Sequence, residues 1–184
     1  MYSKINLSTL LLVLLCLLIL TVNPLTAQDS NNGQTGTKAW LKLGLGHSGG
    51  ENFGGITGTV SAHYFSRYGI IGMRYLISER TGVEPGFLDV NRITRLNEVS
   101  VNWGYSADVS ILIISASAGL GGFWGQEQTA GNQSQYAVIS VPLETQILIR
   151  PFRFFGMGVV LSTSLNTKNT ITSGLLVLQI GSLK

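Results

Sequence analysis

Apolar and polar residues alternate with a period of two along much of this chain, most clearly over 96–123. In the first half of this stretch, Val99, Val101, Trp103 and Tyr105 alternate with Glu98, Ser100, Asn102 and Gly104. After a break at 106–108, Ile114, Ala116, Ala118 and Leu120 alternate with Ser115, Ser117, Gly119 and Gly121. Successive side chains of a β-strand point to opposite faces. The stretch therefore predicts two antiparallel strands, joined by a tight turn and each apolar on one face.

The same alternation recurs on both sides of this pair and predicts six further strands. Their approximate ranges are 38–46, 55–65, 69–79, 135–149, 153–164 and 171–183. The last strand is apolar on both faces, since Leu175 and Val177 alternate with Leu176 and Leu178. No segment after residue 37 has the 3.6-residue period of an amphipathic helix, which argues against parallel βαβ units.

The lengths of the predicted connectors indicate how the eight strands are arranged. Connectors 47–54, 80–95 and 124–134 are long and polar, whereas 66–68, 106–109 and 150–152 are short and 165–170 is intermediate. Long and short connectors then lie at opposite ends of an up-and-down sheet. Eight strands in an open sheet leave two exposed edges, and pairing the first strand with the last removes both. The predicted fold is all-β, an eight-stranded antiparallel up-and-down (meander) closed β-barrel over 38–184. Pro142 predicts a β-bulge, because a closed barrel has no edge strand to hold a proline.

The first 27 residues have the pattern of a secretory signal peptide. Lys4 precedes an apolar run from Leu10 to Val22, which Asn23 and Pro24 then break before Ala27. The run is shorter than the roughly 20 residues of a membrane-spanning helix. We expect a signal-peptide helix over 1–27, a flexible polar lead-in over 28–37, and the barrel domain after it. The single cysteine, Cys16, lies in this leader, so the mature chain has none for disulfides or metal sites.

The composition decides which face of the barrel is apolar. Only 11% of the residues are charged, whereas a soluble domain has roughly 25%. The apolar face carries Leu, Val, Ile, Met, Tyr and Trp, and the opposite face carries Gly, Ser, Thr, Asn and scattered charges. Small residues suit a crowded lumen better than a hydrated surface. Apolar-out and polar-in alternation over strands of roughly ten residues is expected of a membrane barrel. Aromatic residues near strand ends fit interfacial girdles, namely Trp40, Tyr64, Tyr75, Trp103, Tyr105, Trp124 and Phe155.

A signal peptide followed by eight amphipathic strands with alternating short and long connectors resembles the small outer-membrane β-barrels of Gram-negative bacteria, of the OmpA-transmembrane or OmpX type. The resemblance covers about 37–184. It implies location in the cell outer membrane, contact with outer-membrane lipid, and a monomer. It also implies contact with lipopolysaccharide or surface partners through the loops. Arg80, Arg92 and Arg95 flank the longest predicted loop and could hold lipopolysaccharide phosphates or simply solvate the rim.

Several polar side chains are predicted to point into the lumen. Lys42, Arg74, Glu98 and Glu144 form a predicted charge cluster, accompanied by the polar residues His63, Asn102 and Gln179. The cluster could serve as a gate or ion path, or as a plug of paired charges. We favour the plug, because the interior of an eight-stranded barrel is just wide enough for its side chains. We expect His63 to be hydrogen-bonded rather than a metal ligand, since the chain has only one other histidine.

The remaining candidate chemistry is weak. His47, Ser48 and Glu51 fall together in the first predicted loop and could form an acyl-transfer site at the rim, but their spacing is not a signature. Lys and Arg are scattered, so no nucleic-acid surface is indicated. We predict no catalytic, cofactor or metal site. The predicted function is a non-enzymatic outer-membrane barrel with a filled lumen, acting in envelope integrity or surface contact. The alternatives are a soluble exported lipocalin-like barrel that binds an apolar ligand, and a rim-sited lipid-modifying enzyme.

Overall fold

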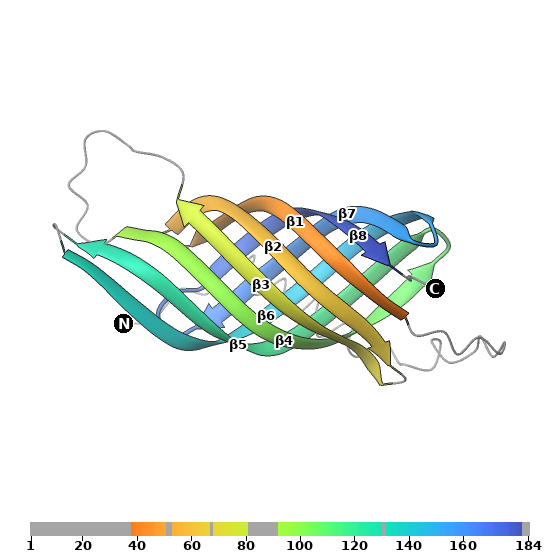
Figure 1. The fold of residues 1–184 in the computed structure, drawn as a ribbon, viewed down its shortest axis with the longest axis horizontal. Coiled ribbons are helices and arrows are strands. Elements are labelled where there is room, and N and C mark those ends of the chain that lie inside the picture. The colour runs from red at the N-terminus through yellow and green to blue at the C-terminus, as the bar shows by residue number, and fades with distance from the viewer. Residues whose placement is uncertain (1–37, 51–52, 67, 81–91, 130–131, 182–184) are drawn as a thin grey trace.

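The computed structural model describes residues 38–50, 53–66, 68–80, 92–129 and 132–181, which fold into a single closed barrel (Figure 1). Eight antiparallel strands follow one another around the ring in chain order. Their bounds are β1 Lys38–Gly50, β2 Phe53–Ser66, β3 Gly69–Arg80, β4 Arg92–Val109, β5 Leu112–Thr129, β6 Asn132–Phe152, β7 Phe155–Asn166 and β8 Ile171–Gly181. The predicted all-β meander barrel is confirmed. The predicted signal peptide and lead-in lie outside the described residues.

Pairing of β1 with β8 closes the ring. The register runs from Trp40 opposite Gly181 to Gly49 opposite Thr172. This pairing satisfies the backbone groups of both strands that would otherwise be sheet edges. The described residues include no helix that is long and apolar enough to cross a membrane.

Two of the predicted long loops are wrong. Residues 47–50 continue β1 and pair with 53–56 of β2, so the connector between these strands is only 51–52. Residues 124–129 and 132–134 likewise belong to β5 and β6. Both segments are polar and rich in Gly or Gln, so they carry no apolar alternation to mark them as strands. These segments are strands nevertheless, because their backbones continue the hydrogen-bonded ladders that precede them. The neighbouring strand supplies the backbone partners regardless of the side-chain pattern.

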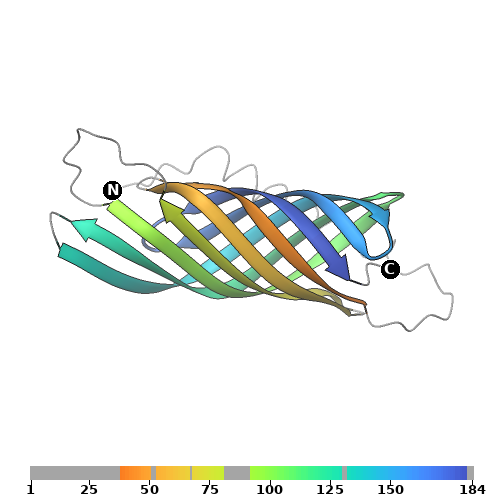
Figure 2. The ribbon, with the colours of Figure 1, turned by 45° about the horizontal axis from the view of Figure 1, so that its top comes forward.

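The extra strand length makes one side of the barrel taller. Strands β4, β5 and β6 extend beyond β1–β3 at the end where β5 meets β6, which we call the hairpin end (Figures 1 and 2). The opposite end, with the turns that join β2 to β3, β4 to β5 and β6 to β7, is the turn end. Pairing of β6 with β7 begins only at Ser140 opposite Asn166. Residues 132–139 of β6 therefore pair with β5 alone.

Pro142 does not produce the expected bulge. The β5–β6 ladder pairs Ala118 with Leu143, omits the next two positions, and resumes at Gly121 opposite Ser140 in the same register. Proline lacks the N–H that a ladder uses. The loss is absorbed by a local gap in pairing, with no residue inserted into either strand. Pro142 points into the lumen, where it is fully buried.

The two faces of the barrel differ in the way the alternation predicts. The outer wall carries the exposed apolar side chains, among them Leu120, Ile139 and Leu176, whose exposed fractions are 68%, 76% and 71%. Such residues occur on all eight strands, and we call this surface the apolar belt. Tyr64, Tyr68 and Trp103 lie toward the turn end of the belt, and Tyr75 and Trp124 toward the hairpin end.

Candidate functional site

Four charged side chains from four strands meet inside the lumen. Lys42 on β1, Arg74 on β3, Glu98 on β4 and Glu144 on β6 are each at most 5% exposed. The Lys42 ammonium contacts Oε1 of Glu144. Nη1 of Arg74 lies 3.2 Å from Oε2 of Glu144, and Nη2 of Arg74 lies 3.2 Å from Oε1 of Glu98. The structure therefore places the predicted charge cluster in one chain of contacts, Lys42–Glu144–Arg74–Glu98, which we call the ionic layer.

Neutral side chains complete the ionic layer. Ser140 donates to Oε1 of Glu98 at 3.3 Å, and Ser164 donates to Oε2 of the same carboxylate. Lys42 also donates to Oε1 of Gln146 at 3.3 Å. Two cations face two anions, so the layer carries no net charge. Buried charges are tolerated only when paired and hydrogen-bonded. These contacts tie β1, β3, β4, β6 and β7 together across the lumen, which suits a plug.

The other predicted lumen residues also point inward. His63 shares a 2.8 Å hydrogen bond between Nε2 and Oγ of Ser61, and its ring stacks on Trp40 with centroids 5.3 Å apart. Asn102 and Gln179 are 4% and 1% exposed. Trp40 lies two residues before Lys42 in β1, so its side chain points to the same inner face. Trp40 therefore belongs to the lumen and not to an interfacial girdle.

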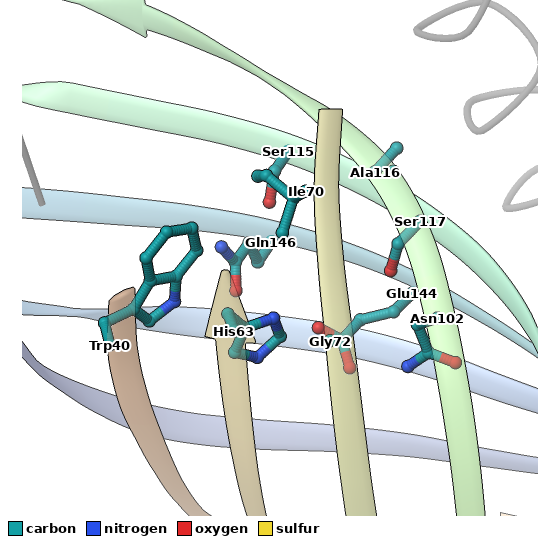
Figure 3. A pocket seen from close by; sticks show the side chains of 11 residues that line it. Trp40, His63, Ile70, Gly72, Asn102, Ser115, Ala116, Ser117, Glu144 and Gln146 are labelled. Atoms are coloured by element: carbon teal, nitrogen blue, oxygen red, sulfur yellow. The ribbon is translucent and has the colours of Figure 1, made fainter. Parts of the chain in front are cut away.

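A small cavity separates several of these side chains. Trp40, His63, Asn102, Glu144 and Gln146 are among the residues that line it, and Figure 3 shows them converging from different strands. Its volume is about 10 Å³. A space of this size accommodates about one water molecule. It is far too small for an organic ligand or a continuous ion path.

Sequence reasoning missed two apolar clusters inside the lumen. Near the hairpin end, one cluster contains Phe53, Ile93, Leu96, Phe123 and Ile171, with Tyr136 and Val138 packed against it. The second contains Ile113, Leu148, Val160, Leu175 and Val177, on the inner faces of β5–β8. The last strand is apolar on both faces, and this pattern could have indicated the second cluster. Leu175 and Val177, on its inner face, point into that cluster. Phe53 and Ile93 lay within predicted loops, so their inward direction was not deduced.

The candidate residues for rim catalysis are not brought together. His47 is exposed on the outer face of β1, whereas Ser48 is buried in the lumen. Ser48 contacts Oγ1 of Thr57 and lies 2.5 Å from Oγ of Ser173. Neighbouring residues on a strand point to opposite faces, so His47 cannot act as the base for Ser48. Glu51 lies outside the described residues. Over the part of the chain that is described, no three His, Cys, Asp or Glu side chains are grouped to hold a metal ion.

The arginines near the longest predicted loop have different surroundings. Nε of Arg95 lies 3.4 Å from Oε1 of Glu79 on the outer wall, and both side chains are substantially exposed. Arg80 ends β3 and Arg92 begins β4. An exposed ion pair of this kind contributes little to stability, but the Glu79 carboxylate offsets the positive charge that Arg95 could present to an anion.

No protein-family model matches this chain, and a search of curated proteins finds no relative. Comparison with solved structures does find similar folds. Neisserial surface protein A matches at 12% identity with a TM-score of 0.59, covering 83% of this chain and all of the other. Ail, the attachment invasion locus protein of Yersinia pestis, matches at 10% identity and a TM-score of 0.55, covering 79% of this chain and 97% of Ail. The N-terminal β-barrel domain of Pseudomonas aeruginosa OprF matches at 13% identity and a TM-score of 0.57, covering 79% of this chain and 99% of that domain.

These three proteins are small eight-stranded outer-membrane barrels. At 10–13% identity the likeness concerns backbone architecture alone. Nearly the whole of each is matched, so the likeness extends around the closed ring. The fold of this chain is that of the small eight-stranded outer-membrane β-barrels.

Proposed function

We propose that this chain is an exported, non-enzymatic barrel of a Gram-negative outer membrane, monomeric and surrounded by outer-membrane lipid, with a filled lumen. Its role is envelope integrity or contact at the cell surface. The observation that supports the proposal best is the apolar belt, which encircles the outer wall while the ions lie inside. Soluble monomers rarely expose contiguous apolar patches of more than a few hundred Å², whereas hydrocarbon solvates such a belt.

The interior supports the same proposal. Groups inside a bilayer must satisfy their backbone hydrogen bonds within the protein, which a closed barrel does. A soluble lipocalin-like carrier needs an apolar cavity for its ligand. Here the lumen centre is the ionic layer, and the cavity beside Trp40 and His63 has a volume of only about 10 Å³. A lumen with paired ions at its centre and so small a cavity beside them does not suit an apolar ligand.

The absence of an enzymatic role is part of the proposal and depends on the rim geometry. His47 and Ser48 lie on opposite faces of β1, which separates the best nucleophile–base candidates of the first strand. The ionic layer has paired partners for all four charges. A structural plug uses its charges in this way, whereas a catalytic site keeps at least one group available to substrate.

A surface-contact role is supported by the tall side of the barrel. Strands β4–β6 extend past the rest of the wall at the hairpin end, where β3 ends and β4 begins, so the long 81–91 connector joins them there. Long connectors of outer-membrane barrels face the cell exterior. The names of two structural neighbours, a surface protein and an attachment invasion locus protein, accord with such a role. Lipopolysaccharide is the partner we expect to meet this region first.

Cell fractionation with a gel-shift assay tests the membrane location. We expect the protein in detergent-extracted outer membranes, with a folded form that migrates differently from the boiled form. Recovery in the periplasmic or culture fluid as a monomer without detergent would favour the soluble carrier. The variant His47→Ala with Ser48→Ala should leave the lipid profile of the envelope unchanged, whereas an altered profile would revive the enzymatic alternative.

A further inference from the structure

A groove of about 530 Å³ lies on the outer wall toward the hairpin end. Its walls come from two rows of cross-strand neighbours on β4, β5 and β6. One row is Asn97, Trp124 and Ala137, and the next is Arg95, Gln126 and Gln135. Cross-strand partners lie on the same face of a sheet. Because Trp124 is an exposed outer-wall residue, both rows face outward, and Tyr75 of β3 borders them.

The groove lies where the apolar belt meets the polar extension of the wall. One step below the first row along each strand are Val99, Gly122 and Ile139, which pair with one another in the same way. Below these lie Val101 and Leu120, exposed at 57% and 68%. Beyond the rows, the next outward side chain of β6 is Gln133, which is exposed and polar. The groove therefore joins a hydrocarbon-solvated surface on one side to a hydrated one on the other, as the headgroup region of a bilayer does.

The side chains of the groove are electrically balanced. Arg95 is paired with Glu79 at 3.4 Å. The Tyr75 hydroxyl donates to Oδ1 of Asn97 at 3.0 Å, and Oε1 of Gln126 accepts from Gln133 at 3.3 Å. The Gln135 amide has no hydrogen-bond partner among the described residues and is exposed. What remains for a ligand is two aromatic rings, the Gln126 and Gln135 amides, and a guanidinium whose charge is already offset. A phosphate would meet the Glu79 carboxylate, whereas uncharged hydroxyl groups would not be repelled.

We propose that this groove binds the uncharged sugar headgroup of a glycolipid in the surrounding leaflet. A sugar ring presents C–H faces that suit Trp124 and Tyr75 and hydroxyl groups that pair with the Gln126 and Gln135 amides. The acyl chains of the same molecule then continue over Ile139, Val101 and Leu120. The inference depends on the proposed membrane location. It adds a recognition mode in which ring contacts and neutral hydrogen bonds, rather than arginine–phosphate pairing, select the lipid.

Lipid retention by the full barrel in phosphatidylcholine nanodiscs tests this inference. The discs are doped with either digalactosyldiacylglycerol, a neutral glycolipid, or phosphatidylglycerol, an anionic lipid without sugar, and retained lipid is counted by native mass spectrometry. We expect preferential retention of the glycolipid. Trp124→Leu should weaken retention about tenfold and Gln135→Ala by a smaller factor, as for an aromatic anchor and an exposed polar contact. The matched control is Trp103→Leu, an exposed tryptophan on the same outer wall toward the turn end, which should retain the glycolipid as the parent does.

Two results would overturn the inference while leaving the membrane proposal intact. These are equal retention by the Trp124→Leu and Trp103→Leu variants, and preference for phosphatidylglycerol over the glycolipid. Gln135→Ala guards against misfolding, because Gln135 is exposed and its side chain has no hydrogen-bond partner among the described residues. Failure of the parent chain to insert into nanodiscs would instead overturn the membrane proposal itself.

Discussion

At the scale of single residues, Glu144 holds the ionic layer together, because its two oxygens contact Lys42 and Arg74 separately. Removing its charge leaves Lys42 without its carboxylate partner and Arg74 with Glu98 alone. Breaking a buried charge pair from one side costs far more than replacing the pair, since the remaining charge stays desolvated.

We therefore expect Glu144→Gln to lower the free energy of unfolding by about 3 kcal/mol or more. Urea titration of the refolded barrel in detergent, followed by gel shift, measures this. The double variant Lys42→Met with Glu144→Gln should recover part of the loss. A double variant that is less stable than Glu144→Gln alone would contradict the pairing.

Gly69 is a second residue whose identity matters. It has φ of +121° at the turn between β2 and β3, and an added Cβ would lie 2.6 Å from the Gly104 carbonyl oxygen. Gly69→Ala should therefore cost about 1–3 kcal/mol in the same urea titration. Gly58→Ala is the control, because its Cβ would point outward and meet only Ile77, at 3.6 Å. Equal stability of the two variants would exclude a backbone effect at Gly69.

Individual residues also show how far the sequence could be interpreted. The four charged residues could be assigned to the lumen because each lies on the polar face of a strand that alternates clearly. They are Lys42, Arg74, Glu98 and Glu144. Their partners could not be assigned, since register around a barrel depends on eight successive pairings. Pro142 shows a different limit. Sequence indicates a defect in the ladder, but whether a bulge or a gap forms depends on the opposing strand, here the segment of β5 around Gly119.

At the scale of elements, every strand was located by its alternation, and strand length was the main error. Apolar alternation marks only the part of a strand that faces the belt. The polar continuations of β1, β5 and β6 are held by pairing with their neighbours. The inward cluster around Phe123 and Leu96 was missed for a related reason, because it lies where the predicted strands ended.

The belt makes a prediction about depth along β4. Val101 lies well inside the belt and is 57% exposed, whereas Val109 lies at the turn end and is 58% exposed. Val101→Arg should destabilise folding into lipid vesicles by about 2–4 kcal/mol, and Val109→Arg by about 0–1 kcal/mol, because the cost of arginine falls toward the interface. Refolding yields into phosphatidylcholine vesicles at graded urea concentrations provide the comparison. Similar losses at the two sites would mean that depth in lipid is not what distinguishes them.

At the scale of the whole molecule, three internal features fill the same lumen. The ionic layer lies among the strands' inner faces together with the two apolar clusters, and the described cavity beside His63 is about 10 Å³. An ion crossing the barrel would have to displace paired charges and packed apolar side chains in succession.

We therefore expect no steady ionic current when the purified barrel is added to a planar bilayer. The measurement is single-channel recording at symmetrical salt, with insertion verified by protease protection of the recovered protein. Resolved, long-lived conductance steps that scale with protein concentration would show that the lumen opens and would restore the ion-path interpretation of the charges.

The hydrogen bonding of β1 to β8 has a consequence for how sequence order relates to architecture. Trp40 and Gly181 face each other across this seam, so the described ends of the chain are neighbours at one rim. A short linker there, with a break at the Ser110–Ile111 turn, gives a circular permutant in which each strand has the same two companions. In a closed ring of strands, the chain can begin at any strand. The architecture depends on which strands are neighbours, and the order of synthesis affects only the folding route.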